Sequence, residues 1–207
     1  MLVTKIEEMD KKRSRVFIDG VFAFVLYKGE LRHYKIKENQ PIEESDYSVI
    51  VHELLPKRAK LRCMNLLKSR TYTEKQLRDK LRQGEYSTDI IEEALAYVKS
   101  FGYVDDRQYA EDFITYNMER KSRRRMEQDL YTKGIDSGIV REIFERLKEE
   151  NDGPDEYSMA KEILRKKNYD SEMATNKEKQ KMSAFLYRKG FNADTIRRVL
   201  LLDITTI

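Results

Sequence analysis

The sequence predicts a mainly α-helical protein, an elongated array of three tandem three-helix repeats with a small N-terminal β-hairpin segment. Three segments of similar pattern recur along the chain, each with apolar residues at helical spacing on both sides of a short turn. Charged residues make up 38% of the 207 residues, against about a quarter in typical domains. This excess indicates much surface for a modest core, which favours an elongated shape.

Residues 1 to about 40 differ from the rest of the chain. The run RVFIDGVFAFVLYKGELRHYKI is rich in β-branched and aromatic residues, and two Xaa-Gly dipeptides interrupt it, Asp19-Gly20 and Lys28-Gly29. Such dipeptides between extended runs are typical of hairpin turns. The sequence therefore predicts a β-hairpin segment at the N-terminus.

The pattern becomes helical from Pro41 onward, and Pro56 is expected to mark a break before the long helical remainder. We therefore place the first domain boundary at residue 56. The repeats then divide the remaining chain at the loops between successive three-helix units. The expected domains are residues 1–56, an N-terminal hairpin and helix extension, and repeats at 57–105, 106–153 and 154–207.

The repeats are clearest in their second and third helices. The aligned segments are LRDKLRQGEYSTDIIEEALAYV from Leu77, MEQDLYTKGIDSGIVREIFERL from Met126 and MSAFLYRKGFNADTIRRVLLLD from Met182. Gly134 and Gly190 suit the left-handed residue that ends a helix. The first copy has Gly84 one position earlier, so the end of its helix stays open. Another helical pattern precedes each segment and completes the three-helix unit.

Several polar residues stand where a helix is expected to begin, and a side-chain oxygen there can accept a hydrogen bond from a free backbone N–H group. The adjacent carboxylates in FGYVDDRQYAEDF could instead be catalytic acids or metal ligands. No histidine accompanies them, and Gln108 follows Asp105 at capping-box spacing, so capping is favoured. The predicted helix caps are Thr73, Asp105, Asp136, Thr175 and Asn192.

Composition and motifs argue against several classes of protein. The chain has one cysteine, Cys63, and two histidines, which excludes an internal disulfide and argues against a zinc site. We find no phosphate-binding glycine loop and no nucleophile with a base at motif spacing. The apolar run Val21–Tyr27 is too short to cross a bilayer. We therefore predict no enzyme activity, metal or cofactor, no membrane contact, and a cytoplasmic monomer.

The segment GYVDDRQYAEDF, which follows DIIEEALAYVKSF and SRTYTEKQLRDKL, resembles the signature region of bacterial RecX regulatory proteins. The resemblance covers roughly residues 57–205 and includes the turns at 133–135 and 189–191. It implies a modulator that binds RecA, the recombinase that polymerises on single-stranded DNA, and inhibits its ATPase and strand-exchange activities. It would thereby act on homologous recombination, DNA repair and the SOS response, with no chemistry performed by this chain.

Charge alternates along the repeats. Residues 57–82 hold ten basic and two acidic residues, whereas residues 83–106 hold one basic and six acidic residues. The alternation recurs further on: residues 136–156 hold three basic and eight acidic residues, and residues 157–191 hold nine basic and four acidic residues. Stacked repeats would therefore gather the basic ends into one stripe, which suits DNA phosphates or an acidic protein groove. We call the following residues the basic stripe: Arg70, Arg78, Arg82, Arg120, Lys121, Arg123, Arg124, Arg125, Arg188 and Lys189.

The run KSRRR, residues 121–125, is the part of the stripe that helix stability explains least, because cations at a helix start oppose the helix dipole. A role in binding is the better explanation for it. Tyr131 and Tyr187 precede the basic turns at equivalent positions. They could stack on bases, as in single-strand binders, or simply close the packing between helices. We include Tyr131 among the predicted partner-binding residues.

Two further functions stay open on the residues alone. A stand-alone DNA-binding protein would use the same stripe directly on single- or double-stranded DNA, although the net charge of +4 is mild for that role. A helical scaffold for an unrelated protein would also fit repeats of this kind.

Overall fold

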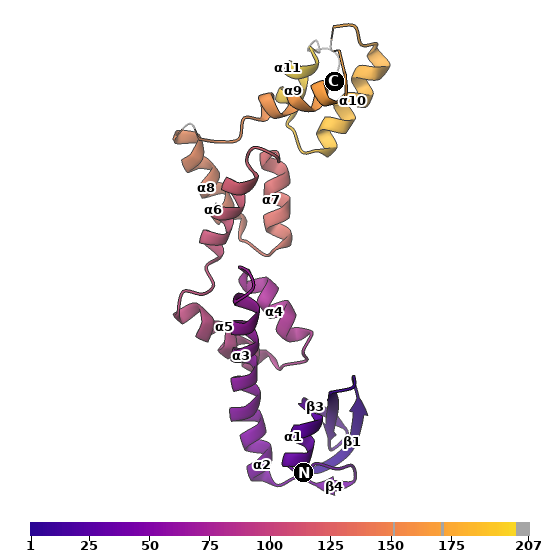
Figure 1. The fold of residues 1–207 in the computed structure, drawn as a ribbon, viewed down its shortest axis with the longest axis vertical. Helices are drawn as coiled ribbons and strands as arrows, with labels where there is room; N and C mark the ends of the chain where they lie inside the picture. The colour runs from indigo at the N-terminus through magenta and orange to yellow at the C-terminus, as the bar shows by residue number, and fades with distance from the viewer. Residues whose placement is uncertain (151, 171, 202–207) are drawn as a thin grey trace. The chain divides into compact units, whose positions relative to one another are not determined.

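The computed structural model describes residues 1–150, 152–170 and 172–201 (Figure 1). It consists of two compact units, Met1–Asp105 and Asp106–Ile207. The first contains a small antiparallel sheet followed by helices, and the described part of the second is helical. The predicted fold class, mainly α with helical repeats and an N-terminal β segment, is confirmed.

The N-terminal sheet has four antiparallel strands in the order β3-β2-β1-β4. The strands are β1 Leu2–Glu8, β2 Arg13–Ile18, β3 Val21–Tyr27 and β4 Gln40–Pro41. The turn at Asp19-Gly20 joins β2 to β3 with φ of 49° and 83°, as a tight hairpin requires. The predicted hairpin is therefore present, but it is the centre and one edge of a larger sheet.

The prediction of a second hairpin turn, at Lys28-Gly29, is wrong. These residues begin a short helix, α1 Lys28–His33, that follows β3 directly. The side chain of Glu30 accepts a hydrogen bond from the backbone N–H of Tyr27 at 2.6 Å, so a capping interaction starts a helix where the dipeptide pattern suggested a turn.

The helix break expected at Pro56 is also wrong. The segments α2 Glu44–Val49, a π-helical turn Ile50–Leu54 and α3 Leu55–Leu67 follow one another without a gap. A proline in a helix removes one donor and crowds the preceding turn. Here the π-helical turn widens the helix just before Pro56, and the Leu55 N–H donates to the Ile50 carbonyl, five residues back.

One face of the sheet packs on this long helical stretch. Val16, Phe24 and Leu26 are buried and belong to the same apolar cluster as Ile50, Leu55 and the helices that follow. Figure 1 shows α2 and α3 passing beside the sheet. The sheet and the first repeat therefore share one core within the first unit.

The first repeat consists of α3, α4 Glu74–Arg82 and α5 Thr88–Ser100. The end of α4, left open by the position of Gly84, is now defined, because Glu85 takes the left-handed conformation with φ of 57°. The Tyr86 N–H donates to the Leu81 carbonyl. Glu85 thus stands where the later repeats have glycine, and its carboxylate is held by Arg15 of β2.

The second unit contains two repeats. Its helices are α6 Asp106–Asn117, α7 Arg123–Thr132, α8 Ser137–Glu149, α9 Glu156–Lys166, α10 Asn176–Arg188 and α11 Ala193–Leu200. Each repeat has its own apolar cluster, one around Met126, Leu130 and Ile143, the other around Leu186 and Ile196. Gly134 and Gly190 have φ of 86° and 90°, which confirms the predicted left-handed helix ends.

Side-chain oxygens stand at the start of several helices. Those of Thr73, Asp136, Thr175 and Asn192 accept hydrogen bonds from the backbone N–H groups of Gln76, Gly138, Glu178 and Thr195, respectively. Asp105 lies directly before α6, and its capping role stays a prediction. Ser122 and Asp155 cap α7 and α9 and were not predicted; Arg125 rather than an acid follows Ser122 at capping-box spacing.

Two findings concern membrane-spanning helices and metal sites. No helix in the described part of the chain combines the length and the apolar character that a membrane span needs. Among the described residues, no three His, Cys, Asp or Glu side chains lie together as a metal site would require.

Candidate partner-binding surface

The stripe residues of the first unit have different environments. Arg78 donates hydrogen bonds to Glu74 and Glu92, and only 21% of its side chain is exposed. It therefore joins α4 to α5. Arg82 is 63% exposed, with Asp79 at 3.9 Å, and the guanidinium of Arg70 lies 4.4 Å from the centre of the Tyr72 ring. Arg70 and Arg82 are the surface cations of this group.

The run KSRRR lies at the start of α7, as predicted, and neighbouring acids neutralise much of it. Arg123 donates to Glu127 at 2.8 Å, while Lys121 and Arg125 share the carboxylate of Asp129 at 2.8 and 3.2 Å. These pairs lie within one repeat. Part of the run is therefore explained by the fold, which the dipole argument alone did not anticipate.

Arg124 makes a different contact. Its guanidinium lies 5.0 Å from the centre of the Tyr187 ring, on α10 of the next repeat. A hydrogen bond between the two side chains raises the pKa of Arg124 and lowers the pKa of Tyr187. Tyr187 is thus a partner of Arg124 within the fold. Tyr131, by contrast, is 76% exposed and presents its ring to solvent.

The N-terminus of α7 also meets the third repeat through polar contacts. The Ser122 hydroxyl donates to the Lys189 carbonyl at 2.9 Å. The Arg123 N–H donates to one oxygen of Glu156 at 2.8 Å, and the Asn192 amide to the other at 3.0 Å. A Cβ on Gly190 would lie 2.5 Å from the Ser122 oxygen. We call these five residues, Ser122, Arg123, Glu156, Gly190 and Asn192, the joint.

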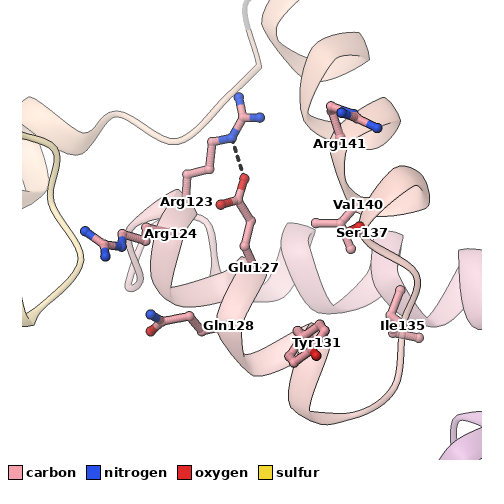
Figure 2. A pocket seen from close by; sticks show the side chains of 9 residues that line it. All are labelled: Arg123, Arg124, Glu127, Gln128, Tyr131, Ile135, Ser137, Val140 and Arg141. Carbon is pink, nitrogen blue, oxygen red and sulfur yellow. Dashed lines mark hydrogen bonds and ion pairs between the residues drawn. The ribbon is translucent and has the colours of Figure 1, made fainter.

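A groove of about 480 Å³ lies between α7 and α8 (Figure 2). Ile135 and Val140, both buried, form its apolar part, and Tyr131 lies at the end near the turn. Arg123 and Arg124 come from α7 and Arg141 from α8, and Figure 2 shows the Arg123–Glu127 pair. We call this the α7–α8 groove. Arg141 was not predicted, since it lies in an acidic stretch of the sequence.

A second hollow, of about 570 Å³, lies beside the joint and collects five residues of the basic stripe from two repeats. We call it the joint pocket. It is lined by Arg120, Lys121, Ser122, Arg125, Ile163, Phe185, Arg188, Lys189 and Phe191. The second unit thus divides its stripe residues between this pocket and the α7–α8 groove.

Comparisons with known proteins follow the same division into repeats. Family models described as the first, second and third three-helix domains of RecX match residues 59–97, 105–142 and 154–200. A protein named regulatory protein RecX from Caldanaerobacter subterraneus subsp. tengcongensis is 31% identical over 97% of this chain and 98% of its own length. The chain belongs to the RecX family.

Other RecX proteins are similar to this chain over most of its length. A regulatory protein RecX from Clostridioides difficile is 30% identical, over 96% of this chain and 94% of its own length. The curated relatives carry the description of regulators rather than of enzymes. A crystal structure of regulatory protein RecX superposes with a TM-score of 0.61 at 20% identity, over 96% of this chain and 98% of the other. The crystal structure of RecX from Lactobacillus salivarius superposes with a TM-score of 0.58 at 21% sequence identity, over 71% of this chain and 95% of the other.

Proposed function

We propose that this chain is a regulator that binds the RecA filament on single-stranded DNA and inhibits its ATPase and strand-exchange activities, and so modulates recombination and repair. The observation that carries the proposal is the match of all three repeats to RecX domains, together with relatives named regulatory protein RecX over nearly the whole chain. We further propose that it acts in the cytoplasm as a monomer, without catalysis of its own.

The α7–α8 groove suits the protein component of such a filament. Protein partners bind best where a desolvated apolar pocket is surrounded by polar groups, and arginine and tyrosine are the side chains that most often dominate affinity. The groove combines buried Ile135 and Val140 with Arg124, Arg141 and the exposed ring of Tyr131. A partner surface that presents an acidic group beside an apolar side chain would complement both the arginines and the apolar part of the α7–α8 groove.

The domain division supports binding along a polymer. We propose that the repeats run over 57–105, 106–153 and 154–207, after a segment of residues 1–56. The family models begin at residues 59, 105 and 154, next to these starts. Repeats that each present a basic end can contact successive subunits of a filament, which would obstruct subunit addition and the cycle of ATP hydrolysis.

Co-sedimentation with RecA filaments assembled on single-stranded DNA tests the proposal. The wild-type chain is expected to pellet with the filaments, and Arg124→Gln to pellet less. Arg165→Gln is the matched control, because Arg165 is a 73% exposed arginine outside both the groove and the joint pocket. Absence of the wild-type chain from the pellet would contradict the proposal.

A stand-alone DNA-binding protein is the second candidate, and the joint pocket is the observation that favours it. A protein with this function binds bare DNA tightly, and its affinity falls steeply as the salt concentration rises. Weak binding to bare DNA at moderate salt, together with good binding to RecA filaments, would exclude it.

A further inference from the structure

The joint pocket differs from an ordinary charged surface in its balance of charge. Lys121 and Arg125 share one carboxylate, that of Asp129. Arg120, Arg188 and Lys189 form no ion pair with any residue in the described part of the chain; Arg120 lies against the Tyr116 ring and Lys189 against the Phe185 ring. Five cationic residues therefore line one hollow, and Asp129 pairs with only two of them, so the net positive charge attracts an anion.

The pocket also offers donors without acceptors. Its polar side chains are the five cations, which only donate, and Ser122. The Ser122 hydroxyl is already engaged, since it donates to the Lys189 carbonyl and accepts from the Arg125 N–H. A peptide would bring one N–H group per residue, each in need of an acceptor. A phosphodiester strand presents only acceptors on its charged backbone, and so matches the pocket.

The remaining lining is apolar and comes from the third repeat. Ile163, Phe185 and Phe191 contribute it. Phe191 is buried, and Lys167 and Lys189 lie over the Phe185 ring, so this lining offers apolar contact for a sugar rather than an open ring face for base stacking. A volume of about 570 Å³ lies in the range of sites that enclose a small ligand. A flexible single strand can enter such a hollow, whereas a duplex, stiff over about 150 base pairs, presents its phosphates on a convex surface.

The joint holds these groups in place. The cations come from two repeats, and Ser122, which is 1% exposed, bonds the two backbones at the edge of the pocket. Gly190 permits the close approach, because a Cβ there would meet the Ser122 oxygen. The pocket is therefore built by the docking of one repeat on the next, rather than by mobile side chains on one helix.

We infer that the joint pocket binds the phosphodiester backbone of single-stranded nucleic acid, through Arg120, Arg188 and Lys189 with Lys121 and Arg125. The inference rests on the proposed function for the biological source of the strand, the DNA of the RecA filament. It adds that this chain contacts the strand itself, at a defined place between the second and third repeats.

The test is fluorescence anisotropy with a labelled oligothymidylate, in the absence of RecA, over a series of salt concentrations. The double variant Arg188→Gln/Lys189→Gln is expected to bind about tenfold more weakly at low salt, with the slope of log K against log salt reduced by about 1.4, the value for two lost contacts to a single strand. Arg120→Gln is expected to reduce that slope by about 0.7. Thermal unfolding of each variant verifies that the fold is intact.

The matched control is Arg165→Gln/Lys166→Gln, an adjacent Arg-Lys pair in the same repeat that is 73% and 70% exposed and does not line the pocket. It removes the same charge and is expected to leave the slope unchanged. The inference is overturned if both double variants lose affinity equally, or if polyglutamate, ATP or a duplex of equal length competes as well as the single strand. If the wild-type chain inhibits RecA but the pocket variants bind the oligonucleotide as well as the wild type does, the pocket inference is refuted and the proposed function stands. If the pocket variants bind the oligonucleotide more weakly, as expected, but the wild-type chain does not inhibit RecA, the proposed function is refuted and the pocket inference stands.

Discussion

Glu156, at the start of α9, accepts a hydrogen bond from the backbone N–H of Arg123, at the start of α7, over 2.8 Å. Its second oxygen accepts from Asn192, the residue that caps α11. One carboxylate therefore serves the beginnings of two helices in different repeats. It also places negative charge at a helix N-terminus whose first three residues are arginines, where an acid is favourable.

Replacement of Glu156 by alanine is expected to lower the free energy of unfolding by about 1–2 kcal/mol, because it removes a helix-start acceptor and the partner of Asn192. Urea unfolding followed by circular dichroism measures the change. Glu172→Ala is the control, since Glu172 is an exposed acid elsewhere in the same repeat. Equal stability of the two variants would mean that the joint contributes nothing to the fold.

Gly190→Ala is expected to destabilise the chain more than Gly20→Ala does. Both glycines have left-handed φ, 90° and 83°, so both substitutions carry a backbone penalty of roughly 1–2 kcal/mol. Only at Gly190 would the new Cβ also meet another side chain, at 2.5 Å from the Ser122 oxygen, whereas nothing lies within 4 Å at Gly20. Thermal unfolding of both variants decides the matter, and a smaller loss at Gly190 would refute the close contact.

Arg58 is expected to be essential for the first unit. Its guanidinium donates to Glu30, to the Val25 carbonyl and to the Tyr86 hydroxyl, and its side chain is 16% exposed. Arg58→Ala should lower the free energy of unfolding by about 3 kcal/mol, because it leaves the part-buried Glu30 carboxylate and the buried Val25 carbonyl without their donor. Lys57→Ala, at the exposed neighbouring position, should change it little. A similar loss in both variants would contradict this role.

Cys63 gives a prediction about pH. Burial raises the pKa of its thiol from 9.0 to about 11, so the folded chain keeps a proton that the unfolded chain releases above pH 9. Stability from this source is complete below pH 9 and is lost as the pH rises towards 11, by about 1 kcal/mol at pH 10. Urea unfolding of the wild type and of Cys63→Ala between pH 8 and 10.5 is the measurement. Parallel pH profiles for the two proteins would contradict it.

The helical repeats follow from the sequence because they depend on local patterns, namely apolar spacing, Gly134, Gly190 and side-chain caps. The N-terminal unit is harder to predict. Strand β1 holds four charged or polar residues among its seven, and its pairing with β4 depends on residues far along the chain. The π-helical turn before Pro56 and the left-handed Glu85, held by Arg15, are likewise consequences of tertiary contacts.

The candidate site was predictable only in part. Sequence spacing placed KSRRR at a helix start, but it could not show that Asp129 neutralises Lys121 and Arg125, or that Arg124 pairs with Tyr187 of the next repeat. Such pairs depend on which helices meet in space. Likewise, Arg78 belonged to the predicted stripe by charge alone, and its bonds to Glu74 and Glu92 give it a structural role.

The single-strand-dependent ATPase of RecA, titrated with this chain, tests the central claim most directly. Wild-type protein is expected to inhibit hydrolysis in proportion to its concentration, Arg124→Gln to require more protein for the same inhibition, and Arg165→Gln to match the wild type. An unchanged rate of hydrolysis at a large molar excess of the wild-type chain over RecA would contradict the proposed function.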